Sequence, residues 1–262
     1  MFRHFLAPKE AETPIKLKKF FYKAGLFWGA SLYPSYPSVD GALKYLKQWG
    51  FEPTSVIDVG AYHGEWTRMF KSIFPSSKVL MIEGQNDKSQ ILQEVCSFFK
   101  SDVVFEIALL GAKDGEKVRF VEMETGSSVF EEFSSYKRNY LEKELVTIDS
   151  LLARHQDFRN LDFLKLDVQG YELEVLKGAC ELLKRTEFVL MEASLIPSNK
   201  SCPLISDVIN FMTEKDFRLL DFCSQIRRRD GALWQTDLLF FKDTSRFMPK
   251  TSLDAQNWEP LT

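Results

Sequence analysis

Strand-like and helix-like segments alternate along most of this 262-residue chain, from about residue 39 to about residue 242. Five short apolar runs have the composition of buried strands. They lie at residues 55–60, 78–83, 103–110, 161–167 and 188–192. Most of the segments between them repeat apolar residues at helical spacing. A chain with this order is expected to form a mostly parallel sheet covered by helices.

The end of the pattern departs from a plain dinucleotide-binding sheet. After an expected helix at residues 203–215, two strand-like segments, 218–228 and 233–241, flank a turn at Asp230-Gly231 and predict an antiparallel hairpin. Class I methyltransferases end in such a strand pair. We therefore expect an α/β, Rossmann-like class I methyltransferase fold: a mostly parallel seven-stranded sheet with an antiparallel C-terminal hairpin and helices on both faces.

The first strand runs directly into a glycine-containing turn, from Gly60 to Gly64, and then into a helix. Glycine lets a backbone bend sharply and approach a ligand with no Cβ in the way. Ligands of open α/β sheets lie at the carboxyl ends of the strands, where this turn is expected. Its Gly-x-x-x-Gly spacing lacks the Gly-x-Gly start that seats a dinucleotide pyrophosphate. The turn therefore predicts a cofactor without phosphate groups.

Two acidic residues indicate which cofactor without phosphate groups is expected. Glu83 ends the second strand, where a carboxylate can accept both hydroxyl groups of a ribose. S-adenosylmethionine has a ribose but no pyrophosphate, and its sulfonium and ammonium groups favour an acidic site to which Asp58 contributes one charge. We expect S-adenosylmethionine to bind through Asp58, Gly60, Gly64 and Glu83. Gly60→Val is expected to prevent donor binding while the fold survives.

From about residue 50 to 242 the order of motifs resembles the FkbM family of S-adenosylmethionine-dependent methyltransferases. Residues 162–179 carry most of the resemblance. The other resembling segments are residues 56–61, Gly64, Glu83, 108–109, 114–116, 126–128, 146–151, 188–192 and 236–240. The resemblance implies methyl transfer to a hydroxyl oxygen of a sugar-like ring or natural product, and we count Ala61, Ala108 and Asp167 as further donor-binding residues. The family usually has Glu where this chain has Gln169, so Gln169 is not counted as catalytic.

Methyl transfer from a sulfonium is an in-line displacement, and an alcohol acceptor also needs a route for its proton. Asp167 ends the fourth strand, Glu172 opens the next helix and Glu192 ends the fifth strand, so all three are candidate catalytic acids. His63, within the glycine turn, is a fourth candidate base. Each has a structural alternative: a first-turn charge for Glu172, an ion pair such as one with Lys165 for the other acids, and simple exposure for His63.

The sequence also gives expectations about a metal ion, about partners and about the cellular compartment. A divalent cation held by Asp167 and Glu192 is open but not favoured. The 34 basic and 37 acidic residues give a net charge of −3, which does not favour nucleic acid as a partner. The four cysteines lie far apart without a metal-binding spacing, which fits reduced thiols in the cytoplasm. A hydroxyl-bearing small molecule or glycan is the expected acceptor.

The methyltransferase domain is expected over residues 38–242, between a helical extension at residues 1–37 and a tail at residues 243–262. The most apolar N-terminal run, residues 20–33, is too short to span a bilayer. For the extension we expect a helix packed on the domain, and a lid, a helix on the membrane surface or a contact with a partner stay open. The alternatives for the whole chain are a methyltransferase-like binding module without catalysis and an NAD-dependent oxidoreductase on a similar sheet.

Overall fold

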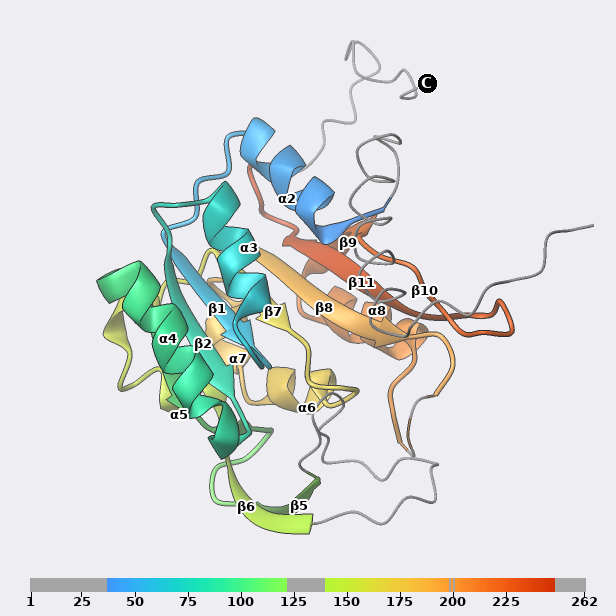
Figure 1. Cartoon of the computed structure of the whole chain (residues 1–262). Coiled ribbons are helices and arrows are strands. Elements are labelled where there is room, and N and C mark those ends of the chain that lie inside the picture. Colours follow the sequence, from blue (N-terminus) through green and yellow to red (C-terminus); the bar gives the residue numbers. More distant parts are fainter. Residues whose placement is uncertain (1–36, 122–139, 198, 200, 248–262) are drawn as a thin grey trace, which may run out of the picture. The chain divides into compact units, whose positions relative to one another are not determined.

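The computed structural model describes residues 37–121, 140–197, 199 and 201–247 (Figure 1). All of these residues belong to one compact unit of the chain. The extension expected at residues 1–37 lies almost wholly outside them, as does most of the tail expected at residues 243–262, so these boundaries stay predictions. Within the described part, no helix is both long enough and apolar enough to cross a membrane.

The main sheet has eight strands in the order β10-β11-β8-β7-β1-β2-β3, and β9 pairs with β11 beside β10. Its strands are β1 (Ser55–Val59), β2 (Lys78–Glu83), β3 (Val103–Ile107), β7 (Phe163–Leu166), β8 (Phe188–Ser194), β9 (Phe217–Phe222), β10 (Ile226–Arg227) and β11 (Leu233–Lys242). The first five are mutually parallel, and β11 runs antiparallel to its neighbours. This confirms the expected fold, and the eighth strand is the short β10, which the sequence pattern merged with β9.

Helices cover both faces of this sheet (Figure 1). One face carries α2 (Val39–Gln48), α3 (Glu65–Ile73) and α4 (Ser89–Phe99). The other carries α5 (Ile148–Leu151), α6 (Glu172–Lys177), α7 (Cys180–Leu183) and α8 (Ile205–Glu214). Three short 3₁₀ helices lie at Asn86–Lys88, Lys100–Asp102 and Gln156–Phe158. Because both faces are covered, every residue of β1 and β7 is buried, which explains why the sequence of these strands is mostly apolar.

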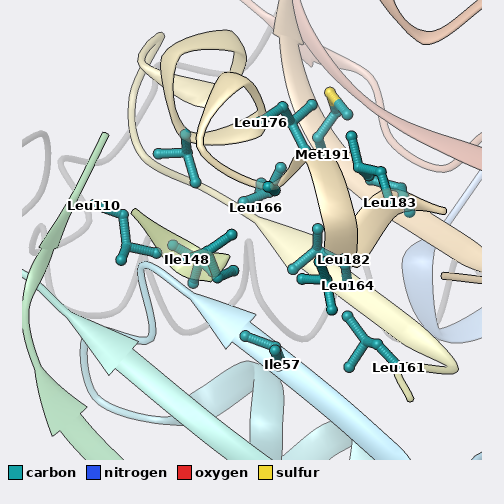
Figure 2. Close-up of a cluster of buried hydrophobic side chains, with 14 of the residues drawn as sticks. Ile57, Leu110, Ile148, Leu161, Leu164, Leu166, Leu176, Leu182, Leu183 and Met191 are labelled. Atoms are coloured by element: carbon teal, nitrogen blue, oxygen red, sulfur yellow. The ribbon is translucent and has the colours of Figure 1, made fainter. Parts of the chain in front are cut away.

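The core on the α5–α8 face is mostly aliphatic. Figure 2 shows Ile57 of β1 and Leu164 and Leu166 of β7 beside leucines of the helices, and all of the labelled side chains are buried. The expected helix over residues 172–184 is divided into α6 and α7 at Gly178. A Cβ on Gly178 would lie 2.2 Å from the carbonyl oxygen of Gly111, so this junction packs directly on backbone.

On the opposite face, beneath α2 and α3, the type of side chain changes along the strands. Near the amino ends it is aromatic: Phe51 lies over Phe188 with ring centroids 4.7 Å apart, and Phe163 and Phe70 pack beside them. Towards the carboxyl ends of β1, β7 and β8 the side chains on this face become charged. The successive pairs are Val56 and Asp58, Phe163 and Lys165, Leu190 and Glu192, and, on the antiparallel β11, Leu239 and Asp237. The fold thus gathers charged side chains at one edge of the sheet.

A second sheet has three strands in the order β4-β6-β5: β4 (Leu109–Leu110), β5 (Lys117–Val121) and β6 (Tyr140–Val146). The single strand expected over residues 103–110 is therefore interrupted. The break lies at Ala108, whose amide donates to the carbonyl of Glu83, and β4 then pairs with β6 instead of β2. This small sheet lies at the same edge as Glu83, because Nζ of Lys143 on β6 donates to the carbonyl of Gly84 at 2.5 Å.

Candidate active site

The turn between β1 and α3 lies against the end of β2. The amides of Gly60 and Ala61 both donate to the carbonyl of Ile82, at 2.9 and 3.2 Å. Gly60 and Gly64 have φ of +72° and +70°, and Tyr62 between them has φ of +50°. Positive φ is accessible to glycine at little cost. The two glycines therefore provide the sharp bend that the sequence predicts.

The structure corrects the reason for glycine at these two positions. A Cβ on Gly60 would lie 1.9 Å from the carbonyl oxygen of Asp167, and one on Gly64 would lie 2.8 Å from a methyl group of Val95. The missing side chains thus make room for the protein's own atoms and not for a ligand. Contact of a ligand with the backbone of Gly60 and Gly64 stays a prediction.

Glu83 is braced at the end of β2. Its side chain is only 5% exposed, Oε2 accepts from the amide of Tyr62 at 2.8 Å, and Oε1 accepts from the amide of Gln85 at 3.0 Å. Each carboxylate oxygen has two lone pairs, so both keep acceptor capacity after these bonds. The backbone thus fixes the orientation of the Glu83 carboxylate, and its contact with a ribose diol stays a prediction.

Asp58 lies deeper than the sequence suggests. It is completely buried, and Oδ2 accepts from the hydroxyl of Thr67 at 2.7 Å. Oδ1 lies 3.0 Å from Nζ of Lys165, in ion-pair contact but without hydrogen-bond geometry. The carboxylate has internal partners on both sides, so direct contact between Asp58 and a ligand stays a prediction.

Lys165 joins the glycine turn to the end of β7. Its ammonium donates to the carbonyls of Gly60 and Val59 at 3.0 and 3.4 Å, and it lies 3.7 Å from Oδ2 of Asp167. Burial lowers the pKa of Lys165, whereas the carboxylates of Asp58 and Asp167 raise it. The effect of the carboxylates is the larger one, so the pKa lies above its usual value. The side chain is therefore a cation. Sequence reasoning treats it only as an ion-pair partner and misses its bonds to the turn.

Of the three candidate acids, Glu172 is buried, whereas Asp167 and Glu192 are both partly exposed, and 43% of the Asp167 side chain is accessible. Its Oδ1 accepts from the side-chain amide of Gln169 at 2.9 Å. Its backbone amide donates to the carbonyl of Val59, which continues the pairing of β7 with β1. The Asp167 carboxylate thus lies beside the glycine turn at the sheet edge.

Glu172 is an internal brace. It is 2% exposed, and one oxygen accepts from the amides of Val168 and Gly170, at 2.9 and 3.2 Å. Burial is the main cause that raises its pKa to about 7, against the effect of these hydrogen bonds. Its contacts are those of the structural alternative, a side chain that holds the turn before α6. A catalytic role for Glu172 stays a prediction.

Glu192 has a partner that sequence reasoning missed. It pairs across β8 and β11 with Asp237, and its Oε1 accepts from the side chain of Gln235 at 2.5 Å. Burial, with Asp167, Glu172 and Asp237 nearby, raises the pKa of Glu192 to about 9. Burial also raises the pKa of Asp237. The signal for Asp237 was an acid directly before the apolar run at residues 238–241 of β11.

The other predicted site residues lie at the same edge. Ala61 is buried in the glycine turn, and Ala108 follows β3 with its amide bonded to Glu83. The ring of His63 stacks on Tyr62 with centroids 3.7 Å apart. A role for His63 as a base stays a prediction. Among the described residues, no three His, Cys, Asp or Glu side chains are grouped in a way that could hold a metal ion.

The acidic cluster predicts a pH-dependent stability. The folded-state pKa of Glu192 is raised, so its stabilising contribution is present below pH 4.5 and is lost as the pH rises to about 9. We expect the free energy of unfolding to fall by about 1–3 kcal/mol between pH 6 and 9 through this group. Urea unfolding of wild type and Glu192→Gln at both pH values measures the effect. An equal fall in the variant would contradict the assignment.

The comparisons with known proteins can now be set beside this geometry. A sequence profile of the Methyltransferase FkbM domain matches residues 58–219. A solved methyltransferase FkbM from Methylobacillus flagellatus KT is 18% identical with a TM-score of 0.49, and the match covers 72% of this chain. This chain spans only 43% of that longer protein. No curated protein sequence matches the chain.

Two further solved structures are similar in fold. A 1,6-didemethyltoxoflavin-N1-methyltransferase from Burkholderia thailandensis, solved with S-adenosylhomocysteine, is 10% identical with a TM-score of 0.46 and coverage of 90% and 94% of the two chains. A magnesium protoporphyrin IX methyltransferase from Synechocystis PCC 6803, solved with S-adenosylmethionine, is 12% identical with a TM-score of 0.48 and coverage of 89% and 86%. The profile match, which takes in more than half of the residues, shows that the chain belongs to the FkbM methyltransferase family.

Proposed function

We propose that this chain transfers the methyl group of S-adenosylmethionine to a hydroxyl oxygen of a sugar, a glycan or another natural-product small molecule. The observation that carries the proposal is the direct packing of the glycine turn on Asp167: the space for a Gly60 Cβ is filled by the Asp167 carbonyl. The accessible Asp167 carboxylate therefore lies beside the turn expected to hold the donor. Membership of the FkbM family supports the choice of a hydroxyl acceptor.

The donor fits the residues at this edge. Glu83 is oriented by two backbone amides and keeps lone pairs for ribose hydroxyls. The charged groups around the turn include the carboxylates of Asp58, Asp167 and Glu83, with Lys165 as a counter-charge among them. This balance favours a cationic ligand. We assign Asp58, which has no exposed surface, to this negative field and not to direct contact.

When bound, S-adenosylmethionine supplies an electrophilic methyl group on its sulfonium. The protein's part is to orient the acceptor hydroxyl and to receive its proton. Asp167 is the group that we assign to both tasks, because its carboxylate is accessible and its Oδ1 is anchored. Glu192 lies on the next strand and, with its raised pKa, carries a proton at neutral pH, so it is less suited to act as a base.

The proposal is tested with two ligands and an acceptor panel. Calorimetry should show binding of S-adenosylhomocysteine and none of NAD, because the turn lacks a pyrophosphate seat. Release of S-adenosylhomocysteine from S-adenosylmethionine should then be measured with the methyl glycosides of glucose, galactose, mannose, rhamnose and fucose, and with catechol. Donor binding without transfer to any acceptor, also in an extract of the source cells, would favour a binding module. Preferential binding of NAD would favour an oxidoreductase.

Glu83→Gln is expected to weaken S-adenosylhomocysteine binding by about 1.5–3 kcal/mol, the usual worth of a hydrogen bond to a charged group. The amide keeps the shape of the side chain but offers a weaker acceptor to the ribose. Isothermal calorimetry measures the change, and Glu94→Gln on the solvent-facing side of α4 is a matched control. Equal affinity in the two variants would remove Glu83 from the site.

A further inference from the structure

The turn after β7 holds Gln169 in a conformation that other residues enforce. Gln169 has φ of +55°, which costs a residue with a side chain about 1–3 kcal/mol and persists only where the surroundings impose it. Two hydrogen bonds to the backbone hold this conformation. The carbonyl of Gln169 accepts from the buried side chain of Asn199 at 3.1 Å, and the amide of Gly170 donates to Glu172. Strain of this kind at a sheet edge calls for a functional explanation.

The consequence of this conformation lies in the Gln169 side chain. It reaches the residue at the end of β7, where Nε2 donates to Oδ1 of Asp167 at 2.9 Å. The other oxygen, Oδ2, lies 3.7 Å from the ammonium of Lys165. One oxygen of the accessible carboxylate is therefore anchored by a neutral donor, while the other faces the cation at longer range.

The surrounding charges explain why the anchor is an amide. The charged groups around Asp167 are Lys165 on its own strand, Asp58 on β1, Glu172 on α6, Glu192 on β8 and Asp237 on β11. A carboxylate at position 169 would add a further negative charge next to Asp167, and like charges at short range favour uptake of a proton. A side-chain amide donates a hydrogen bond without adding charge.

We propose that Gln169 is a positioning residue that holds Asp167 as an oriented carboxylate, so that Oδ2 is presented to the acceptor hydroxyl. The inference rests on the proposed function and adds to it the group that prepares the base. Gln169 acts through Asp167, and Asn199 and Glu172 fix the backbone that carries its side chain. The neutral residue at this position is then a functional feature of this chain.

Two variants with side chains of equal length separate the two properties of the amide. Gln169→Met removes the donor, and Gln169→Glu replaces it with a charge. With the best acceptor of the glycoside panel, we expect kcat to fall about 10-fold in the first and about 100-fold in the second at pH 7. The KM for S-adenosylmethionine and the affinity for S-adenosylhomocysteine should stay within about 2-fold. The control is Gln156→Glu, which adds the same charge at an exposed position.

A spectroscopic measurement needs no acceptor. In the full-length protein, the side-chain amide signals of Gln169 in ¹⁵N–¹H spectra should move when Asp167→Asn removes the charge of the carboxylate that they contact. Signals that do not respond to Asp167→Asn would overturn the inference. So would a kcat that falls in Asp167→Asn but is the same in Gln169→Glu and Gln156→Glu. A kcat that survives Asp167→Asn would instead overturn the proposed base.

Discussion

Gly60→Ala is expected to lose about 2–5 kcal/mol of stability and its donor binding together. The new methyl group would lie 1.9 Å from the carbonyl oxygen of Asp167, so the turn or the end of β7 has to shift. Overpacking of this kind typically costs 1–3 kcal/mol. A side chain at φ of +72° adds a strain of similar size. Urea unfolding and calorimetry with S-adenosylhomocysteine measure the two losses.

Gly231→Ala is the matched control for this experiment. Gly231 has φ of +88°, but a Cβ there would meet nothing within 4 Å. It should lose only about 1 kcal/mol, the cost of the backbone strain alone. If Gly60→Ala were as stable as this control but failed to bind the donor, the glycine would be needed for ligand approach, as the sequence alone suggests. Equal stability with full binding would show that the turn adapts.

The main sheet could be predicted because its signal is local. Runs such as residues 55–60 and 78–83 are mostly apolar, which is typical of strands covered on both faces. The small sheet could not be predicted in this way. Its strand β4 has two residues, and the break before it depends on the bond from Ala108 to Glu83. The boundary between α6 and α7 likewise depends on the backbone of Gly111, far away in the sequence.

The candidate site was predictable as a set of positions but not as a set of roles. Asp58 lies near the end of β1, Asp167 follows β7 and Glu172 opens α6, and nothing in their order distinguishes their roles. Burial does: Asp58 and Glu172 are enclosed with internal partners, whereas Asp167 is accessible. The partners that decide this, Thr67 and Lys165 for Asp58, come from other elements of the fold. Periodicity in one sequence does not carry such information.

Asp167→Asn is expected to lower kcat about 10²–10⁴-fold, the usual worth of general acid–base assistance. Asparagine keeps the size of the side chain, and its carbonyl oxygen can still accept from Gln169, so the turn should hold its shape. What is lost is the group that receives the proton of the acceptor hydroxyl. Affinity for S-adenosylhomocysteine should change little, because Glu83 and the glycine turn are untouched.

The control is Asp157→Asn, which removes an exposed carboxylate of the Gln156–Phe158 3₁₀ helix that pairs with Lys78. Assays of both variants with the best acceptor of the glycoside panel should separate loss of a surface charge from loss of the base. Normal turnover in Asp167→Asn would exclude Asp167 and leave Glu192, Glu172 and His63 as candidates. If turnover does depend on Asp167, treatment of the wild type with EDTA distinguishes direct proton transfer to Asp167 from a role through a metal ion. Activity that is lost and restored by Mg²⁺ would mean that Asp167 acts through a metal ion, whereas activity that persists would mean that the carboxylate takes the proton directly.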